Sequence, residues 1–561
     1  MIKDVQRVIS AAEMREIDRL TTERYATPSL LLMEAAAASA LKAITARFSN
    51  DLSRRRVRIF CGRGNNGGDG AALARALWLA GARVDVVLFG RVEETKGDAR
   101  TNFEIVRRLA SFEAGSKASP PPLTLIECET VAAWEEIARP RATYEIIVDA
   151  IFGTGLSRPL EGIPLQVVEH LALIRDARDR AQTAQPLIVS LDIPSGLNAD
   201  SAELIGKAIC ADLTITFTSP KRANVLPPAS HNNGQLVIAN IGTPPALLES
   251  TRTKLFLTEE QDAREWLIKT RYTPDSYKNT HGHALIIAGS RGLTGAAVLS
   301  GNAAMCAGAG LVTIAAPASA QPAIAAQALP EVMTAVLAET DQGAVSSEAV
   351  ERAKRLAERA SVVAIGPGLT SEHEQTRRFV REMIAGRTTP VVIDADALNA
   401  LAPWPATLRG SLEHPLILTP HPGEMLRLLG TENKEALADR VGIAREFATA
   451  HSLILVLKGT RTIVAAPDGR VLINPTGNAG LGTAGAGDTL TGIITGFNAQ
   501  SAATLKDEAD ALSATVAAVY LGGMAGDMAA RELGMRTMLA SDIRKHLSAA
   551  IRALDAAGER P

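Results

Sequence analysis

The feature that most limits how this 561-residue chain can fold is a repeated alternation of short apolar runs with longer helical patterns. Clear runs are VRIF (57–60), VDVVLF (84–89), YEIIVDAIF (144–152) and PLIVSLDIP (186–194). Strands that are buried on both faces of a parallel sheet read as continuous apolar segments, and crossover helices join them. The alternation therefore predicts an α/β fold with buried parallel sheets.

The alternation occurs in two series, with a break near residue 250. The strand-like LTITF (213–217) and QLVIANIG (235–242) close the first series, and TPPALLESTRTK (243–254) reads as a linker. A second series runs from HALIIAG (283–289) to TIVAAP (462–467) and ends in a long helical tail from about Asp507. We therefore predict two domains, 1–250 and 251–561.

Helices are predicted ahead of the first strand. Ser10 and Glu13 have the spacing of a capping box before a helical apolar pattern, and Pro28 precedes the apolar SLLLMEAAAASALKAI (29–44). The proline-rich segment 113–123 predicts a surface loop.

Composition excludes several classes of protein. The 59 Lys and Arg residues nearly balance 61 Asp and Glu residues, for a net charge of −2, so a nucleic-acid partner is not expected. No run of about 18 apolar residues predicts a signal peptide or a membrane span. The cysteines are far apart and form no CxxC pair, which argues against zinc and disulfides and favours a reducing cytoplasm. They are Cys61, Cys128, Cys210 and Cys306.

A glycine-rich loop follows the first predicted strand. Five glycines lie within residues 62–70, where the chain enters a helix. Backbone N–H groups at a helix start favour an anion, so a phosphate-bearing ligand is expected. The same glycines could merely pack a helix onto a strand, and neither GxxxxGK[ST] nor GxGxxG is present.

Polar residues follow two further apolar runs of the first series. Asp149 and Asp192 each come at the end of a run, and Ser195 lies in the Pro/Gly turn after Asp192. Ligands of open parallel sheets bind beyond the carboxyl ends of the strands. These carboxylates could act as acid or base, or hold a cation, or simply stabilise turns.

Three motifs of the first series occur in family order. GNNGGDG (64–70), VDAIFGTGLSRP (148–159) and SLDIPSGL (190–197) resemble the N-terminal YjeF family of NAD(P)HX epimerases, which implies a Rossmann-like three-layer domain. The resemblance implies that Asp192 is catalytic and that oxygens of Asn66, Asp149 and Ser195 bind K⁺. The substrate contacts that it implies are Asn65, Asn66, Gly67, Gly68, Asp69, Gly153, Thr154, Gly155, Leu156, Ser157, Arg158, Pro159 and Asp192.

The strongest motif of the second series is GNAGLGTAGAGDTLTGIITG (477–496). GAGD opens a helix, so N–H groups near Gly487 can surround a phosphoryl group while Asp488 accepts the proton of an attacking hydroxyl. Alternatively, the glycines only relieve helix crowding. Upstream, Lys458 and Arg461 of KGTRT (458–462) could clasp nucleotide phosphates, although exposed basic turns are common.

AIGPGL (364–369), VVIDADALNAL (391–401) and TPHPGE (419–424) extend this motif into a resemblance to ribokinase-like kinases. Within them the sequence resembles the C-terminal YjeF family of ADP- or ATP-dependent NAD(P)HX dehydratases, although it has GNAG and GAGD where that family usually has GNPG and GTGD. The implied substrate contacts are Ala296, Gly368, His421 and Asp488, with Asp488 catalytic. The implied nucleotide contacts are Lys458, Gly459, Thr460, Arg461, Thr462 and Gly487.

Some residues of these motifs have a second interpretation. Without its motif, His421 would be read as a core or capping histidine. Glu424 lies where the kinase superfamily has an acid linked to magnesium. Asp394 and Asp396 could support the site or merely end a strand.

The whole chain resembles the family of bifunctional NAD(P)H-hydrate repair enzymes. The resemblance implies epimerisation of R- and S-NAD(P)HX, and ADP-dependent dehydration of S-NAD(P)HX to NAD(P)H with release of AMP and phosphate. It also implies K⁺ in the first domain, Mg²⁺ with ADP (or ATP) in the second, and a cytoplasmic homo-oligomer without membrane or nucleic-acid partners. The alternatives are a ribokinase-type small-molecule kinase with a nucleotide-sensing N-terminal domain, and a non-catalytic binding module in front.

Overall fold

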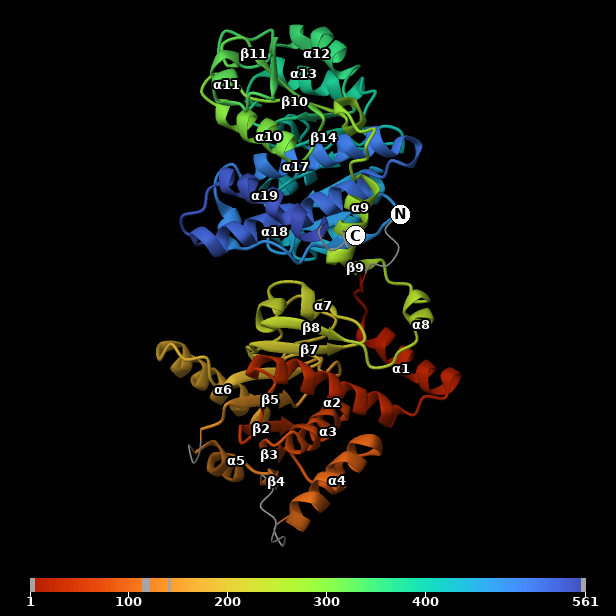
Figure 1. Cartoon of the computed structure of the whole chain (residues 1–561), viewed down its shortest axis with the longest axis vertical. Coiled ribbons are helices and arrows are strands. Elements are labelled where there is room, and N and C mark those ends of the chain that lie inside the picture. Colours follow the sequence, from red (N-terminus) through yellow and green to blue (C-terminus); the bar gives the residue numbers. More distant parts are fainter. Residues whose placement is uncertain (1–5, 114–121, 140–142, 556–561) are drawn as a thin grey trace. The chain divides into compact units, whose positions relative to one another are not determined.

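The computed structural model describes residues 6–113, 122–139 and 143–555, which fall into two compact units (Figure 1). The first unit is Arg7–Thr253, and the second begins at Lys254 and also includes Gln6. The chain thus passes between the units at residues 253–254, close to the boundary expected near residue 250. Most of the loop predicted at 113–123 lies outside the described residues.

The first unit is built on a seven-stranded sheet in which every neighbouring pair is parallel. Its order is β4-β3-β2-β5-β6-β7-β8. The strands are β2 (Arg56–Cys61), β3 (Arg83–Leu88), β4 (Leu123–Glu127), β5 (Ile146–Ala150), β6 (Leu187–Leu191), β7 (Leu213–Phe217) and β8 (Gln235–Ala239).

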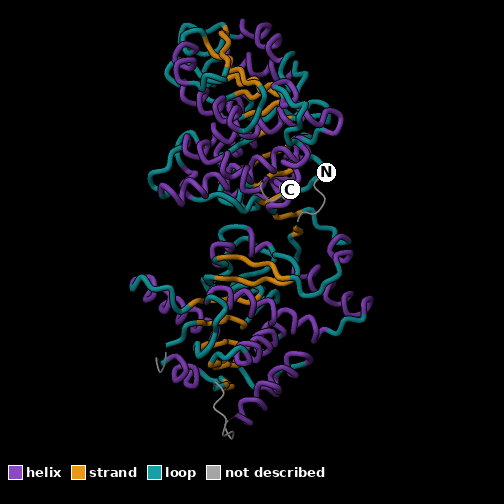
Figure 2. Tube along the Cα trace, viewed as in Figure 1, coloured by secondary structure: helices purple, strands orange, loops and turns teal. Residues whose placement is uncertain are grey.

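Helices cover both faces of this sheet, which gives three layers (Figure 2). Ile59 packs with α2 and α3, whereas its neighbour Phe60 packs with Trp134 of α5 and Val167 of α6, because successive strand residues point to opposite faces. The predicted Rossmann-like three-layer unit has this architecture. The helices are α1 (Ala11–Tyr25), α2 (Ser29–Thr45), α3 (Asn65–Leu79), α4 (Gly97–Glu113), α5 (Val131–Ala138), α6 (Gly162–Arg180), α7 (Arg222–Val225) and α8 (Pro245–Glu249).

Local signals at the start of the chain act as predicted. Ser10 caps α1 through the backbone of Glu13, and the Glu13 carboxylate accepts from Ser10 N in return at 2.9 Å. The predicted linker 243–254 was wrong in part, because it contains α8. Leu247 of α8 is buried with Met14 and Ile17 of α1, a contact that local composition does not encode.

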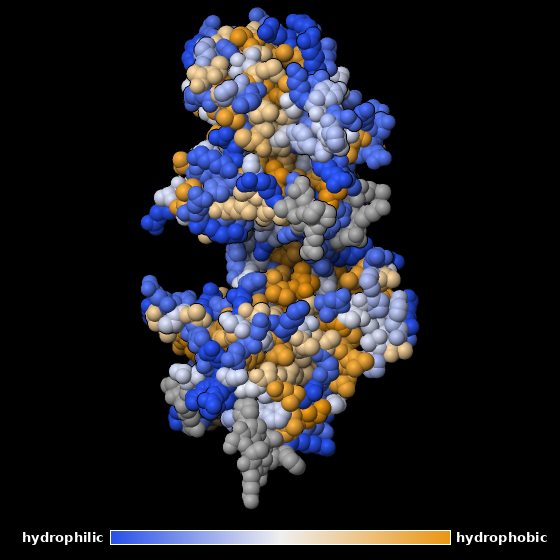
Figure 3. All heavy atoms as spheres, viewed as in Figure 1, coloured by the Kyte–Doolittle hydropathy of each residue, from blue (hydrophilic) through white to orange (hydrophobic). Residues whose placement is uncertain are grey.

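One helical stretch of the described residues, Ser29–Phe48, is long and apolar enough to cross a membrane by length and composition, with a mean hydropathy of 1.4. Core helices of soluble proteins meet the same criteria. Ala36, Ala40 and Ile44 of α2 are buried against the sheet, while Leu31 is 56% exposed. Apolar residues accordingly reach the surface over α2 (Figure 3).

The second unit is built on an eleven-stranded sheet of order β1-β9-β18-β17-β16-β15-β14-β13-β10-β11-β12. Strands β10 to β16 pair in parallel, and β17 is antiparallel to both of its neighbours. The strands are β1 (Gln6–Arg7, of which Gln6 belongs to this unit), β9 (Leu255–Leu257), β10 (His283–Ile287), β11 (Leu311–Pro317), β12 (Met333–Leu337), β13 (Val362–Ile365), β14 (Val391–Ile393), β15 (Leu416–Leu418), β16 (Ile454–Leu457), β17 (Ile463–Ala465) and β18 (Val471–Ile473).

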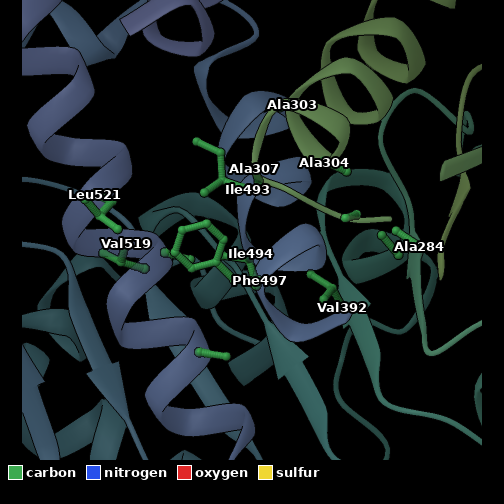
Figure 4. Close-up of a cluster of buried hydrophobic side chains, with 14 of the residues drawn as sticks. Ala284, Ala303, Ala304, Ala307, Val392, Ile493, Ile494, Phe497, Val519 and Leu521 are labelled. Atoms are coloured by element: carbon green, nitrogen blue, oxygen red, sulfur yellow. The ribbon is translucent and has the colours of Figure 1, made fainter. Parts of the chain in front are cut away.

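The core of this unit forms around α17, which carries the GAGD motif. A Cβ at Gly492 would lie 2.1 Å from the Ser300 carbonyl oxygen, so the absence of side chains lets α17 approach α10. Figure 4 shows Ile493, Ile494 and Phe497 of α17 with Ala303 and Ala304 of α10, Ala307 directly after α10, and Val519 and Leu521 of α18. The helices are α9 (Glu260–Lys269), α10 (Thr294–Cys306), α11 (Gln321–Gln327), α12 (Val350–Ala357), α13 (Glu374–Ala385), α14 (Ala395–Ala400), α15 (Pro422–Leu429), α16 (Arg440–Ala450), α17 (Ala486–Gln500), α18 (Ala511–Leu533) and α19 (Ala540–Asp555).

Candidate active sites

The first candidate site lies where the strand order of the seven-stranded sheet reverses. From β2 the chain continues to β3 on one side, and β5 pairs with β2 on the other. In open parallel sheets, ligands bind at the carboxyl ends of the strands at such a point. The chain leaves β2 through Gly62 and Gly64 and enters α3 at Asn65, with no side chain capping that helix. The first N–H groups of α3 therefore lack an intrahelical partner at this end of the sheet.

Packing accounts for most glycines of this loop. A Cβ at Gly62 would lie 2.1 Å from the Ile151 carbonyl oxygen, and a Cβ at Gly67 would lie 1.8 Å from the Gly62 carbonyl oxygen. Gly68 and Gly70 are similarly enclosed, whereas Gly64 faces open space. The packing interpretation is therefore correct for these enclosed glycines, and a substrate contact at Gly67 or Gly68 stays a prediction.

Three of the predicted residues meet beside the loop. A Cβ at Gly153 would lie 3.2 Å from Asp192 Oδ2 and 3.5 Å from Asn66 Cγ. Asn66 is 9% exposed, and neither its amide oxygen nor its nitrogen has a hydrogen-bond partner among the described residues. Because buried amides nearly always have partners, the unpaired amide makes Asn66 a candidate for binding a group from outside the chain.

Asp192 has a strained backbone and a buried cationic partner. Its φ of 62° lies in the left-handed region, which non-glycine residues adopt at a cost. Its Oδ1 atom accepts from Lys221 Nζ at 2.6 Å and from Thr216 Oγ1 at 3.2 Å. Sequence reasoning missed Lys221, although its position in the proline turn after β7 places it at the same sheet edge.

Asp149 joins the two turns that form the site. Its carboxylate accepts from Ser195 Oγ at 2.6 Å, Ser195 N at 2.8 Å, Ser190 Oγ at 2.9 Å and Ile151 N at 3.2 Å. Burial raises the pKa of Asp149, and the hydrogen bonds from Ser195 and Ser190 oppose that rise. Asp149 thus fixes Ser195 beside the loop that carries Gly153.

Two further carboxyl groups act on Asp192 from neighbouring helices. Burial raises the pKa of Asp18, on α1, to about 6, against the opposing charge of Lys221. Burial, followed by the charges of Asp192 and Asp18, raises the pKa of Asp69 well above its usual range. Asp69 was predicted from its motif, whereas Asp18 was missed because nothing in the N-terminal helix marks it locally.

The remainder of the predicted segment 153–159 forms a more exposed loop. Gly155, Ser157, Arg158 and Pro159 are exposed, and Thr154 and Leu156 are half-buried. Their contacts with a substrate stay predictions.

The second candidate site lies where the strand order of the eleven-stranded sheet reverses, between β10 and β13. The loop after β13 carries Gly368, and α10, which follows β10, carries Ala296. A Cβ at Gly368 would lie 3.2 Å from Ala296 Cβ, so the fold brings these two predicted residues together.

The GAGD motif begins α17, as predicted. Gly485, with φ 83°, precedes the helix, and no side chain caps it. A Cβ at Gly487 would meet just one group within 4 Å, Lys458 Nζ at 3.3 Å, so the ammonium borders the free N–H groups of the first turn. Burial raises the pKa of Asp488 to about 6, with the charge of Asp394 adding to the rise and that of Lys458 opposing it.

Lys458 is held by carboxylates from two other strand ends. Its Nζ donates to Asp394 Oδ1 at 2.8 Å and lies 3.9 Å from Glu424 Oε2, while Thr491 Oγ1 donates to Asp394 Oδ2 at 2.7 Å. Burial lowers the pKa of Lys458, but the charges of Asp394 and Glu424 reverse that effect and leave the pKa raised. Of the two interpretations left open for Asp394, the structure favours support of the site.

His421 is the N-cap of α15. Its Nδ1 accepts from Gly423 N at 3.0 Å and Glu424 N at 3.3 Å, and the Glu424 carboxylate accepts from His421 N at 2.8 Å. The capping interpretation is therefore correct for its Nδ1. The side chain is 50% exposed, so the predicted substrate contact remains open to Nε2.

The rest of KGTRT is tied to its surroundings. Arg440, missed by the sequence analysis, lies 3.1 Å from where a Cβ of Gly459 would be, and donates to the Thr460 carbonyl at 3.0 Å. Arg461 donates to the Pro475 carbonyl at 2.9 Å, and Thr462 Oγ1 donates to the Gly459 carbonyl at 3.1 Å. Among the predicted nucleotide contacts, Lys458 and Gly487 are therefore the two that the fold brings side by side.

Two α/β units, each with an acidic side chain at a sheet edge beside an uncapped helix start, define a two-site enzyme. Residues 29–223 match the family described as YjeF-related protein N-terminus, and residues 284–549 match the family NAD(P)H-hydrate dehydratase. The chain belongs to the family of bifunctional NAD(P)H-hydrate repair enzymes. This result confirms the predicted family and fold class.

Relatives match over nearly the whole chain. The bifunctional NAD(P)H-hydrate repair enzyme Nnr of Moorella thermoacetica is 42% identical over 98% of this chain and 97% of its own length. The enzyme of the same name from Escherichia coli is 33% identical over 86% of this chain and 83% of its own length. A solved ADP/ATP-dependent NAD(P)H-hydrate dehydratase of Bacillus subtilis is 32% identical over 53% of this chain and 98% of that chain, with a TM-score of 0.45.

Proposed function

We propose that this chain repairs hydrated nicotinamide coenzymes at two sites. The first unit interconverts R- and S-NAD(P)HX, and the second dehydrates S-NAD(P)HX to NAD(P)H at the expense of ADP. The observation that carries the proposal is the placement of Asp488 and Lys458 at the same uncapped helix start, in a chain whose full-length relatives bear the repair-enzyme name. Those relatives favour this function over the ribokinase-type kinase.

Asp488 is the base of the second site. With a pKa of about 6 it is ionised at neutral pH and still basic enough to take the proton of the substrate hydroxyl. The hydroxyl oxygen then bonds to the terminal phosphorus of ADP as the bond to AMP breaks. The N–H of Gly487 and the ammonium of Lys458 stabilise the charge that develops there.

The phosphorylated intermediate explains why a kinase-like site catalyses a dehydration. Hydroxide is a poor leaving group, whereas phosphate is a good one. The bond from ring carbon to phosphate breaks, the neighbouring carbon loses a proton, and the ring double bond of NAD(P)H is restored.

The remaining predicted residues of this unit position the two ligands. We assign the hydrated dinucleotide to Ala296, Gly368 and His421. Buried carboxylates such as Glu424 and Asp394 have the hard oxygens that Mg²⁺ prefers, so they suit a cation that accompanies ADP. Mg²⁺ supplies charge neutralisation at the phosphates. We assign the nucleotide to Lys458, Gly459, Thr460, Arg461, Thr462 and Gly487.

Asp192 is the acid–base residue of the first site. Its Oδ2 faces Gly153 and Asn66, where the hydroxyl-bearing carbon of the substrate would lie. Asp192 takes the proton of the substrate hydroxyl and passes it to the ring nitrogen as the carbon–nitrogen bond breaks, which leaves an aldehyde. The nitrogen then adds to the opposite face of that carbonyl, and the proton returns to the oxygen through Asp192. The buried unpaired oxygen of Asn66, with Ser195 and Asp149, suits K⁺, which supplies positive charge next to the substrate.

We further propose that the chain acts as a cytoplasmic homo-oligomer on NADHX and NADPHX, with ADP or ATP. All four cysteines are free thiols, which suits a reducing compartment.

The direct test supplies purified protein with an R/S hydrate mixture, Mg²⁺, K⁺ and ADP, and follows the return of reduced-nicotinamide absorbance. Conversion of both epimers is expected. Conversion of one epimer would contradict the assignment of the first unit, and no conversion would contradict that of the second. A phosphorylated product that persists would favour the kinase, and unchanged epimerisation by Asp192→Ala would favour the binding module.

A further inference from the structure

A fully buried lysine lies behind the reactive carboxylate of the first site. The inference drawn from it rests on the proposed epimerase function of that site. We propose that Lys221 is a positioning residue, which holds Asp192 Oδ1 inside the fold and thereby presents Oδ2 to the substrate.

Lys221 has no means of touching a substrate itself. Its side chain is 1% exposed, and its ammonium donates to Asp192 Oδ1 at 2.6 Å, Thr216 Oγ1 at 3.1 Å and the Phe217 carbonyl at 3.2 Å. These three acceptors use all three N–H donors of the ammonium. Any effect of Lys221 on the reaction therefore passes through Asp192 or through the fold.

The two oxygens of Asp192 have different surroundings. Oδ1 receives Lys221 and Thr216, at 2.6 and 3.2 Å. Oδ2 lies 3.2 Å from the position of a Cβ at Gly153, which is also 3.5 Å from Asn66, whose amide is unpaired among the described residues. A carboxylate that is anchored at one oxygen has one orientation. The free oxygen, Oδ2, therefore already points toward the substrate position before a substrate binds.

The backbone of both residues is fixed by the same amide. Asn224 Nδ2 donates to the Asp192 carbonyl at 3.2 Å, and Asn224 Oδ1 accepts from Lys221 N at 2.9 Å. This bridge holds the left-handed turn at Asp192 against the turn that carries Lys221. The pair is thus built into one rigid unit.

The charges around the pair favour the same role. Asp18 interacts electrostatically with both Lys221 and Asp192, and Asp69 interacts with Asp192 and Asp18. Lys221 thus carries positive charge beside a group of three carboxyl side chains. A buried carboxylate without a cation is strongly disfavoured, and neighbouring acids add to that cost. The hydrogen bond from Lys221 therefore gives Asp192 the cationic partner that a buried carboxylate requires.

A double-mutant cycle on the full chain tests whether Lys221 acts through Asp192. Lys221→Met is expected to lower kcat for epimerisation roughly 10- to 100-fold with little change in KM, because the carboxylate loses its alignment. Asp192→Asn alone and Lys221→Met/Asp192→Asn together are expected to have equal residual rates. The inference would be overturned if the rate loss of the double variant equalled the product of the two single losses. It would also be overturned if Lys221→Met raised KM and left kcat unchanged.

Thermal unfolding gives a readout apart from activity. Lys221→Met leaves a buried carboxylate unpaired, so the unfolding temperature is expected to fall, and Asp192→Asn in that background is expected to raise it again. The control is Lys207→Met, which removes an exposed lysine paired with Glu169 and should change neither rate nor unfolding temperature. If Lys221→Met alone does not fold, a folded double variant supports the inference, and a double variant that also fails to fold contradicts it.

The two proposals fail in different ways. An unsubstituted chain that does not interconvert the epimers would refute the epimerase function. Active epimerase with a multiplicative cycle would refute the role of Lys221 alone.

Discussion

The two sites use the same pair of residue types in different roles. In the first, Lys221 is entirely buried and contacts Asp192, the carboxylate that we propose to be reactive. In the second, the side chain of Lys458 is 18% exposed and borders Gly487. Its ammonium is paired with Asp394, which is not the carboxylate proposed to react. Among the described residues, no lysine donates a hydrogen bond to Asp488, the carboxylate proposed to be reactive there, and Lys458 donates to Asp394 instead.

The difference follows from what each reaction must stabilise. An epimerase needs a carboxylate with one defined orientation, and a buried ammonium provides it. Phosphoryl transfer develops negative charge outside the carboxylate, so the ammonium must face the ligand. Pairing the lysine with the reactive acid would then lower the basicity that Asp488 gains from burial.

The largest effect expected is the loss of one reaction without the other. Asp488→Asn is expected to slow dehydration of S-NAD(P)HX about 10²- to 10⁴-fold, the usual contribution of a general base. Epimerisation should be unchanged, and Asp192→Asn should show the reverse pattern. Both rates are measured on separated epimers, with exposed Asp507→Asn as control. A variant that loses both reactions together would contradict two independent sites.

The glycine next to Lys458 provides the next comparison. Gly487→Val is expected to slow dehydration roughly 10²- to 10³-fold, because the side chain fills the space between the N–H groups and Lys458, which lies 3.3 Å from a Cβ there. Gly482→Val adds the same side chain where nothing lies within 4 Å and should have little effect. Nucleotide binding measured by calorimetry should weaken for Gly487→Val; unchanged binding and rate would exclude the phosphoryl site.

Sequence patterns predicted the elements that carry these sites more fully than the contacts within them. The apolar run LTITF coincides with β7, the run QLVIANIG begins with β8 but extends three residues beyond it, and the Ser10 capping box is present. Such signals depend on neighbours in the chain. The GAGD helix start was likewise predictable, since a glycine at positive φ directly before a helix is a local requirement.

The missed residues depend on contacts between distant segments. Lys221 meets Asp192 across 29 positions because β6 and β7 pair in parallel, and Thr491 meets Asp394 across 97 positions because α17 packs near β14. Asp18 carries no motif, and its raised pKa results from burial in the folded unit. Periodicity identifies which residues are buried, but the partner of a buried charge is decided by topology.

A third prediction tests whether Lys458, unlike Lys221, acts on the ligand directly. Lys458→Met leaves Asp394 and Glu424 buried near one another without a cation, which is expected to cost about 3–5 kcal/mol of stability. Adding Asp394→Asn should restore part of that stability but none of the lost dehydration rate, because in the proposed mechanism Lys458 itself faces the phosphoryl group. Denaturant unfolding and kcat are compared for both variants. Recovery of the rate in the double variant would make Lys458 a positioning residue like Lys221.

The smallest effect expected is on stability: replacing the carboxylate by an amide should stabilise the protein at Asp488 but destabilise it at Asp192. The pKa of Asp488 is raised from 3.8 to about 6 in the fold, so its ionised form costs stability above pH 6 and costs nothing below pH 4. Asp488→Asn should therefore stabilise the second unit at pH 8 by the order of 1–3 kcal/mol, with no gain at pH 4. Dehydration by the unsubstituted chain should fall as the pH drops through about 6, because the base becomes protonated.

Asp192→Asn should instead destabilise the first unit at pH 8, since it leaves the buried ammonium of Lys221 without its carboxylate. Unfolding temperatures at pH 4 and pH 8 check both signs, and the same sign for both variants would show that the carboxylates are held in the same way.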